Sequence, residues 1–212
     1  MSYDPAQQLA HQVARLVEIG YPQLAGLDEV SFRQLVEPLA EPATGIPERD
    51  DLPFVLVVTR ELVRPEVAVP LLRLAGGRKP GVVDRNHLDG DLATYHPLPE
   101  LGLDGLGSAR AYLLTGVQRG EEFCGVRPED ALPVILGRGR TPLTIDEGIA
   151  VVAQAPYLLE KNKCFMLSGS RRHDRRVPAM WISEGAPKLG WCWDGNPHTW
   201  LGVASAAGRL AG

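Results

Sequence analysis

The sequence predicts an α+β protein: one compact domain with a mixed or antiparallel sheet and a helical N-terminal lead. Helical hydrophobic periodicity dominates the start of the chain, and short apolar runs typical of strands follow it. Further helical patterns interrupt these runs without the regular alternation of a βα repeat. We therefore expect a single domain over residues 1–212, with a helical lead at 1–40, a linker at 41–52 and an α+β body at 53–212.

The lead begins with a helical pattern in residues 5–20. Its apolar residues recur at the spacing of one helical face: Leu9, Val13, Leu16 and Val17. Pro5 is favoured in a first turn, and Gly20 is favoured at a helix end. A second helix is expected to start at Ser31, with Gln34 completing a capping box.

The body contains several runs that are rich in apolar and β-branched residues and are bounded by turn formers. The strands that they predict lie at residues 53–59, 81–84, 109–117, 164–170, 177–183 and 187–193, the last two joined by an EGAP turn. Residues 84–102 have the composition of a loop.

Three helices are expected between these strands. The clearest is at residues 144–154, because Thr144 and Glu147 form a capping box in front of an apolar stripe. Pro70 favours a short helix that begins at Leu71 and ends at the following glycine pair. A helix also starts at Pro128, and Pro133 predicts that it breaks or ends early.

The stretch PKLGWCWDGNPHTWLG, residues 187–202, is unusually rich in tryptophan, and Asp194-Gly195 favours a turn inside it. In one continuation the chain returns as a strand, so that Trp191 opposes His198 across a hairpin. In the other, Asn196 caps a helix over residues 196–207. We favour the helix, although Gly202 weakens it by roughly 1 kcal/mol relative to alanine.

Either continuation brings together the residue types that line a small-ligand pocket. We expect Trp191, Trp193 and Asn196 to bind a ligand, with Arg171 or Arg172 reaching an anionic group. For an enzyme, His198 would be the acid/base and Asp194 its orienting group. The competing interpretations are that the tryptophans fill the core and that the arginines of GSRRHDRR, residues 169–176, form a solvated hairpin tip.

The best functional hypothesis is therefore a small-molecule-binding protein, and the sequence leaves open whether it is an enzyme that acts on a small anionic or aromatic metabolite through the C-terminal Trp/Asp/His pocket. The alternative is a non-catalytic protein-interaction module, since Trp and Arg are enriched at interface hot spots. A third hypothesis, a metal site that recruits Cys192, His198, His87 or Cys124, has no tight ligand spacing behind it. The polar segment 84–87 (DRNH) is borne on a loop, where functional residues often lie, and an Asx turn explains it equally well.

Composition excludes several other classes. The chain has 22 basic and 26 acidic residues and a net charge of −4, which argues against nucleic acid as a partner. No apolar run approaches the ~20 residues of a membrane span, and the N-terminus lacks the pattern of a signal peptide. We therefore expect a cytoplasmic protein with no membrane partner whose three cysteines are buried thiols. The sequence leaves the cofactor and the oligomeric state open.

Several long stretches, in order, resemble a family of short, mostly actinobacterial proteins of unknown function. They are FVLVVTRELV, PLLRLAGGRKPGVVDR, RGEEFCGV, GRGRTPLTIDEGIAVV and VPAMWISEGAPKLGWCWDGNPHTWLG. The resemblance extends from about residue 8 to the C-terminus. It implies one self-contained domain and implies no activity, cofactor or site residue.

Overall fold

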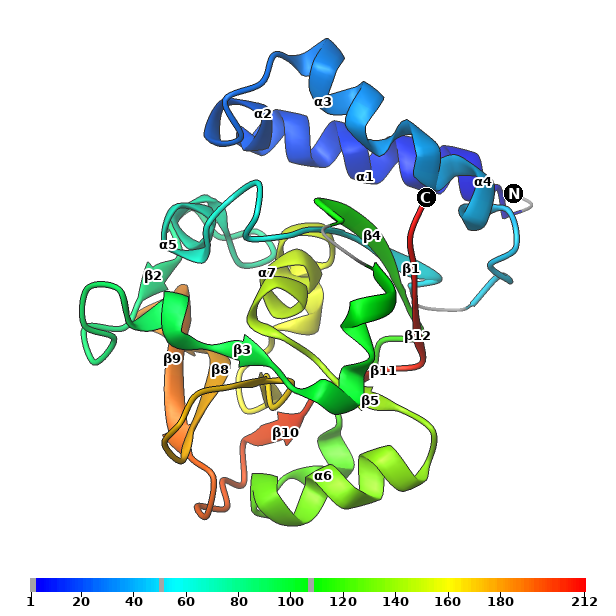
Figure 1. Ribbon diagram of the computed structural model, residues 1–212. Helices are drawn as coiled ribbons and strands as arrows, with labels where there is room; N and C mark the ends of the chain where they lie inside the picture. The colour runs from blue at the N-terminus through cyan, green and yellow to red at the C-terminus, as the bar shows by residue number, and fades with distance from the viewer. Residues whose placement is uncertain (1–2, 50–51, 107–108) are drawn as a thin grey trace.

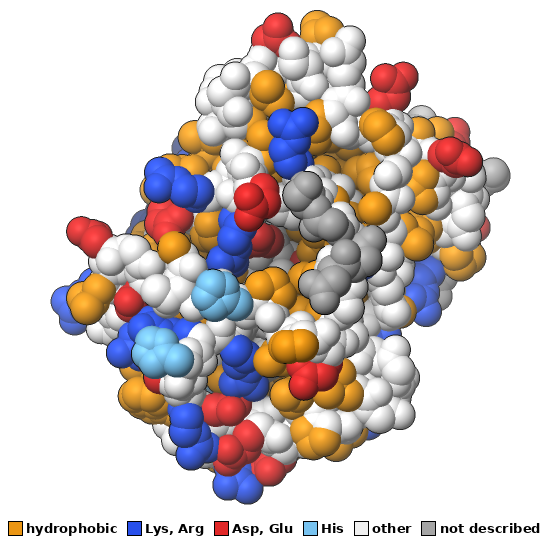
Figure 2. Space-filling model, in the orientation of Figure 1, with side chains coloured by type: hydrophobic (Ala, Val, Ile, Leu, Met, Phe, Trp, Pro, Cys, Tyr) orange, Lys and Arg blue, Asp and Glu red, His pale blue; other side chains and the backbone are white. Residues whose placement is uncertain are grey.

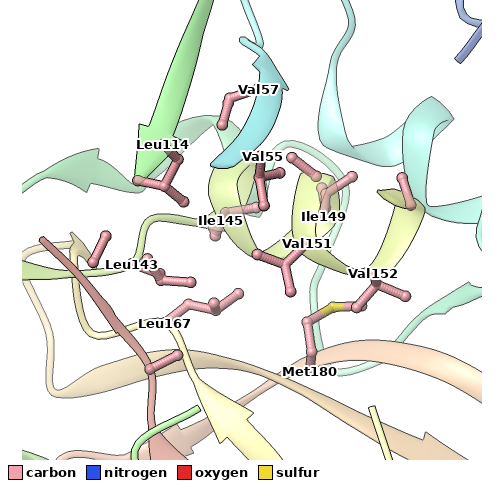
Figure 3. Close-up of a cluster of buried hydrophobic side chains, with 14 of the residues drawn as sticks. Val55, Val57, Leu114, Leu143, Ile145, Ile149, Val151, Val152, Leu167 and Met180 are labelled. Carbon is pink, nitrogen blue, oxygen red and sulfur yellow. The ribbon is translucent and has the colours of Figure 1, made fainter. Parts of the chain in front are cut away.

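One apolar helix, α7 (Ile145–Gln154), lies at the centre of the protein between two sheets (Figure 1). The computed structural model describes residues 3–49, 52–106 and 109–212. Figure 3 shows side chains of α7 pointing toward Val55 and Val57 on one side, and Val152 lying beside Met180 on the other. Eight residues of α7, from Ile145 to Ala153, are buried, so the helix supplies core to both sheets.

The remaining helices and the strands follow in chain order. The other α-helices are α1 (Pro5–Ile19), α2 (Tyr21–Leu24), α3 (Glu29–Val36), α4 (Ala40–Ala43), α5 (Pro65–Ala68) and α6 (Pro128–Gly137). The strands are β1 (Phe54–Val58), β2 (Val82–Val83), β3 (His96–Pro97), β4 (Ala111–Thr115), β5 (Thr141–Pro142), β6 (Cys164–Met166), β7 (Ser170–Arg171), β8 (Arg176–Ser183), β9 (Ala186–Trp193), β10 (Leu201–Val203), β11 (Ser205–Ala206) and β12 (Gly208–Leu210).

The two main sheets differ in their pairing. The smaller one is antiparallel, with the order β1-β4-β12. The larger one has the order β10-β6-β8-β9-β2 and is mixed, because β10 runs parallel to β6 and β2 parallel to β9. Two short ladders, β11-β5 and β3-β7, connect loops around them. The predicted α+β class with a mixed sheet is confirmed.

The helical lead covers the open edge of β1. Helix α1 packs a buried face that includes Leu9, Val13 and Leu16, and it contacts both β1 and α7. The Gln12 amide donates to the Phe54 carbonyl at 2.8 Å and accepts from the Leu56 N–H at 2.6 Å. A side chain thus satisfies backbone groups that an edge strand otherwise leaves unpaired. None of the helices in the described ranges is long and apolar enough to span a bilayer.

Most predicted elements are present close to their expected positions. The helix at the N-terminus ends at Gly20, whose φ of 98° is the left-handed conformation that glycine adopts at low cost. The Thr144–Glu147 capping box is formed. Strands β8 and β9 are joined by the predicted turn, where Glu184 and Gly185 both have positive φ, as a two-residue hairpin turn of this kind requires.

Three helix predictions are corrected. Ser31 is not the cap of α3; its N–H donates to Asp28, which is the N-cap, and the helix begins at Glu29. The helix expected from Leu71 is absent, because the helical turns start earlier, at Pro65, and the chain becomes extended at Leu72. Helix α6 continues through Pro133. That proline lies on the exposed face, where a carbonyl that loses its helical partner stays accessible to water.

The C-terminal prediction is also wrong. Residues 196–207 form no helix, and they do not return along β9 as a hairpin. The chain instead crosses to the opposite edge of the larger sheet, where β10 pairs in parallel with β6. A Cβ on Gly202 would lie 2.5 Å from the Gly120 carbonyl oxygen, so this close backbone approach requires glycine. The helical stripe was misleading because residues 201–206 are all buried, and a fully buried segment fits any period.

Candidate functional site

A pocket of about 640 Å³ lies where the segment after β1 faces the loop between β2 and β3. Residues 60–66 form one wall, and residues 83–93 form the other. Charged side chains of both signs line both walls. This combination of concave shape and converging polar groups is typical of a small-molecule site.

Two arginines in this pocket are free to bind an anionic group. Arg64 and Arg85 are exposed, and their guanidinium groups have no ion-pair or hydrogen-bond partner among the described residues. Three carboxylates of the same lining are likewise unpaired within the described part of the chain: Glu61, Glu66 and Asp89. The pocket therefore presents unused groups of both charges.

His87 is the buried polar residue of this pocket. Its side chain is only 8% exposed, and neither ring nitrogen makes a hydrogen bond of normal geometry with any described residue. The ring lies edge-on to Tyr95, with 5.9 Å between the centroids. Burial lowers the pKa of His87, against the opposing effects of the Gly190 backbone and the carboxylates of Asp91 and Asp84. A lowered pKa favours the neutral imidazole, in which one ring nitrogen is a donor and the other an acceptor.

The loop that carries His87 is held in place at its first turn. Asp84 accepts a hydrogen bond from the Asn86 N–H at 2.8 Å, which is the Asx turn considered for this segment. Asp84 also pairs with Lys188 of β9 at 3.3 Å. Hydrogen bonds and this ion pair lower the pKa of Asp84 despite its partial burial.

A second anchor fixes the end of the same loop. Arg60 makes a two-pronged ion pair with Asp146 in the first turn of α7, with Nη2 2.9 Å from Oδ1. Its Nη1 donates to the carbonyls of Leu92 and Tyr95, at 3.2 and 3.0 Å. Arg60 therefore joins β1, the helix α7 and the loop, which makes one wall of the pocket rigid.

Two of the predicted site residues support this loop from behind. Arg172 lies 3.2 Å from the Asp91 carboxylate and stacks on the Tyr95 ring at 5.5 Å from its centroid. The Trp191 indole N–H donates to the Asn86 carbonyl at 3.2 Å. Arg176 covers the other part of the Trp191 ring, 4.6 Å from its centroid. The arginine cluster at 169–176 is thus largely engaged with carboxylates and aromatic rings, and the expected solvated tip is corrected.

The remaining predicted residues have other partners, apart from Trp193, which contacts Trp191. Asp194 pairs with Arg171 at 2.9 Å. His198 instead lies edge-on to Trp200, 5.7 Å between centroids, and burial lowers its pKa. Trp193 is 46% exposed and contacts Trp191, and Asn196 is exposed. The ion-pair partner of Asp194 is therefore an arginine, and the acid/base roles of His198 and Asp194 stay a prediction.

The comparisons with known proteins define the family of this chain. A family model described as a family of unknown function, DUF5701, matches residues 15–212. The chain belongs to this family. Neither the curated proteins nor the solved structures that were searched contain a match. The family identity therefore supplies no activity, and any function has to be argued from the site itself.

The cysteines do not contribute to the pocket. All three are free thiols, and burial raises the pKa of each, in Cys192 to about 11. Thiolates are the reactive form, so the raised pKa values disfavour reactivity of these cysteines at neutral pH. Within the described ranges, no three His, Cys, Asp or Glu side chains cluster as a metal site would require.

The sequence signalled only part of the pocket. The loop-borne segment 84–87 was recognised as polar, and it supplies Arg85 and His87. Arg60 and Arg64 gave no signal, because an exposed arginine after a strand is common. The role of Arg60 follows from its contact with Asp146, which is 86 residues away in the chain.

Proposed function

We propose that the protein binds a small polar molecule carrying both an acidic and a basic group in the pocket of His87, Arg64 and Arg85. The observation behind this proposal is His87, a buried imidazole without a hydrogen-bond partner of normal geometry in the wall of a pocket of about 640 Å³. Buried polar groups are normally satisfied, and an exception at a pocket points to a ligand group or water that completes it.

The unpaired charges suggest how such a ligand is held. Guanidinium groups bind carboxylate or phosphate with paired hydrogen bonds. Arg64 and Arg85 would therefore bind the acidic group of the ligand. Glu61, Glu66 and Asp89 offer acceptors for an ammonium group. A ligand with both charges pairs with both sets, whereas a ligand with only one charge gains one of these interactions and should bind less tightly.

The test is a thermal-shift and calorimetry panel of the standard amino acids, each with its matched simple carboxylate and amine. We expect amino acids to raise Tm and to bind about tenfold more tightly than either matched compound, and Arg64→Ala or Arg85→Ala to abolish that preference. The matched control is Arg78→Ala, which removes an exposed arginine outside this pocket. The proposal fails if no amino acid binds, or if the two pocket variants bind as the wild type does.

The same panel separates this pocket from the C-terminal residues. His87→Asn should weaken amino-acid binding, because it changes the wall of the pocket. His198→Ala should not, because His198 lies beside Trp200 and outside the lining. If His198→Ala alone weakened binding, the ligand would occupy the surface around Trp191, Trp193 and Asp194 instead.

A further inference from the structure

A second pocket, of about 720 Å³, adjoins the first. Arg60, Glu61 and Ala93 line both of them, so the two pockets share one wall. The second pocket is bounded by the end of β1, the strand β3 and the first turn of α7. Figure 2 shows the corresponding face, which is hollowed near its centre and bordered there by hydrophobic side chains, a histidine and charges of both signs.

The lining of the second pocket is mainly apolar and carries fewer charged side chains than that of the first. Its apolar and aromatic members beyond the shared wall are Tyr95, Pro97, Leu103, Leu106, Ala109 and Tyr112. Some of its polar groups are in use within the fold, whereas the buried Tyr95 hydroxyl makes no hydrogen bond of normal geometry and the Glu61 carboxylate has no partner among the described residues. Asp146 is neutralised by Arg60, and the Tyr112 hydroxyl donates to Glu147 at 2.8 Å. The free energy available here comes from burying apolar surface.

The shared wall allows one molecule to occupy both pockets. Ala93 is exposed and presents only a methyl group between them. Arg60 is held in the shared wall by Asp146 and by two loop carbonyls, which leaves its charge paired within the fold. A charged group beside His87 and an apolar group above Tyr112 would then belong to one ligand that passes over Ala93.

We propose that the ligand is amphipathic, with its charged head in the pocket of Arg64, Arg85 and His87 and an apolar tail in the pocket of Leu103, Leu106 and Tyr112. This inference rests on the proposed function and specifies the ligand class as an amino-acid-like head with an alkyl or aryl extension. The test uses 2-aminoalkanoic acids of increasing chain length, from alanine to 2-aminodecanoic acid, titrated by calorimetry into the full-length protein. For the wild type we expect affinity to rise about two- to fourfold with each added methylene.

Two variants of the apolar pocket locate the tail. Leu106→Glu places a charge beside it, and Ala109→Trp fills the space that it would occupy; neither residue lines the charged pocket. Both should remove the dependence on chain length and leave the affinity for alanine unchanged. The control Val134→Glu adds the same charge at an exposed position of α6 and should behave as the wild type.

The outcomes separate the two proposals. If alanine binds and affinity does not rise with chain length, or if the rise survives both Leu106→Glu and Ala109→Trp, the amphipathic ligand is excluded and the charged pocket stands. If no member of the series binds, the proposed function itself fails. Arg64→Ala should lower the affinity of every member by the same factor, because it acts on the head alone.

Discussion

The carboxylate of Glu147 and the guanidinium of Arg209 form an ion pair inside the core, where their side chains are 0% and 6% exposed. Arg209 Nη2 lies 2.9 Å from Glu147 Oε2. Glu147 also accepts from the Tyr112 hydroxyl at 2.8 Å and from the Thr144 N–H at 2.7 Å. One buried carboxylate therefore connects the last strand, the strand β4 and the start of α7.

Removing the cation of this pair should strongly destabilise the fold. Arg209→Met leaves Glu147 charged in the core without its partner, and breaking a buried pair in this way costs about 3–5 kcal/mol. Urea unfolding should show this loss in the free energy of unfolding. Arg33→Met is the control, since it breaks the exposed pair with Glu29 and should change stability by less than about 1 kcal/mol. Equal losses in the two variants would contradict the argument.

Glu147 also shows how far sequence patterns extend. The capping box with Thr144 was predicted, because its residues are three positions apart and the pattern is local. Its pairing with Arg209 was not predictable, because it connects residues 62 positions apart. The same limit explains the site: His87 lay in a segment recognised as polar, whereas its walls depend on Arg60 meeting Asp146 across the fold.

The tryptophan-rich segment illustrates a second limit. The high density of tryptophan in this segment is evident from the sequence. The partners of each indole, however, depend on the path of the chain after Gly195. Because β10 joins β6, Trp200 lies edge-on to Trp181 at 6.3 Å between centroids, while Trp191 and Trp193 remain near the loop of the pocket. None of these four tryptophans is fully buried, so they are not simply core filling.

Gly190 should be intolerant of a side chain. A Cβ at this position would lie 2.0 Å from the Trp181 ring, which covers the glycine on the neighbouring strand. Gly190→Ala should displace the indole and lower the free energy of unfolding by about 1–3 kcal/mol. The change should also alter tryptophan fluorescence. Gly137→Ala is the control, because nothing lies within 4 Å of its Cβ; a similar loss there would show that the effect is not steric.

Arg60→Lys should loosen the loop of the pocket while keeping the charge. A lysine ammonium cannot reproduce the paired contact with Asp146 together with the bonds to the carbonyls of Leu92 and Tyr95. Losing two such hydrogen bonds should speed amide exchange about tenfold or more in residues 88–97. Hydrogen exchange with mass spectrometry measures this. Arg127→Lys, at an exposed pair with Asp130, should leave exchange in this loop unchanged; unchanged exchange in Arg60→Lys would remove its anchoring role.

His87, which is buried, and His198, which is partly buried, should make stability fall in mild acid. Burial lowers the pKa of both His87 and His198 below the ordinary value of 6.5, so below that pH the unfolded chain binds protons more readily than the folded protein does. The free energy of unfolding should decrease as the pH drops from 7 through the lowered pKa values. Below those pKa values, these two histidines should cause no further decrease.

Urea unfolding at a series of pH values should show a smaller decrease in His87→Asn and in His198→Asn. His11→Asn, which alters an exposed histidine of α1, should keep the full decrease. If His87→Asn also showed the full decrease in the free energy of unfolding, protonation of His87 would not oppose folding. The imidazole would then not be held neutral by burial beside the pocket.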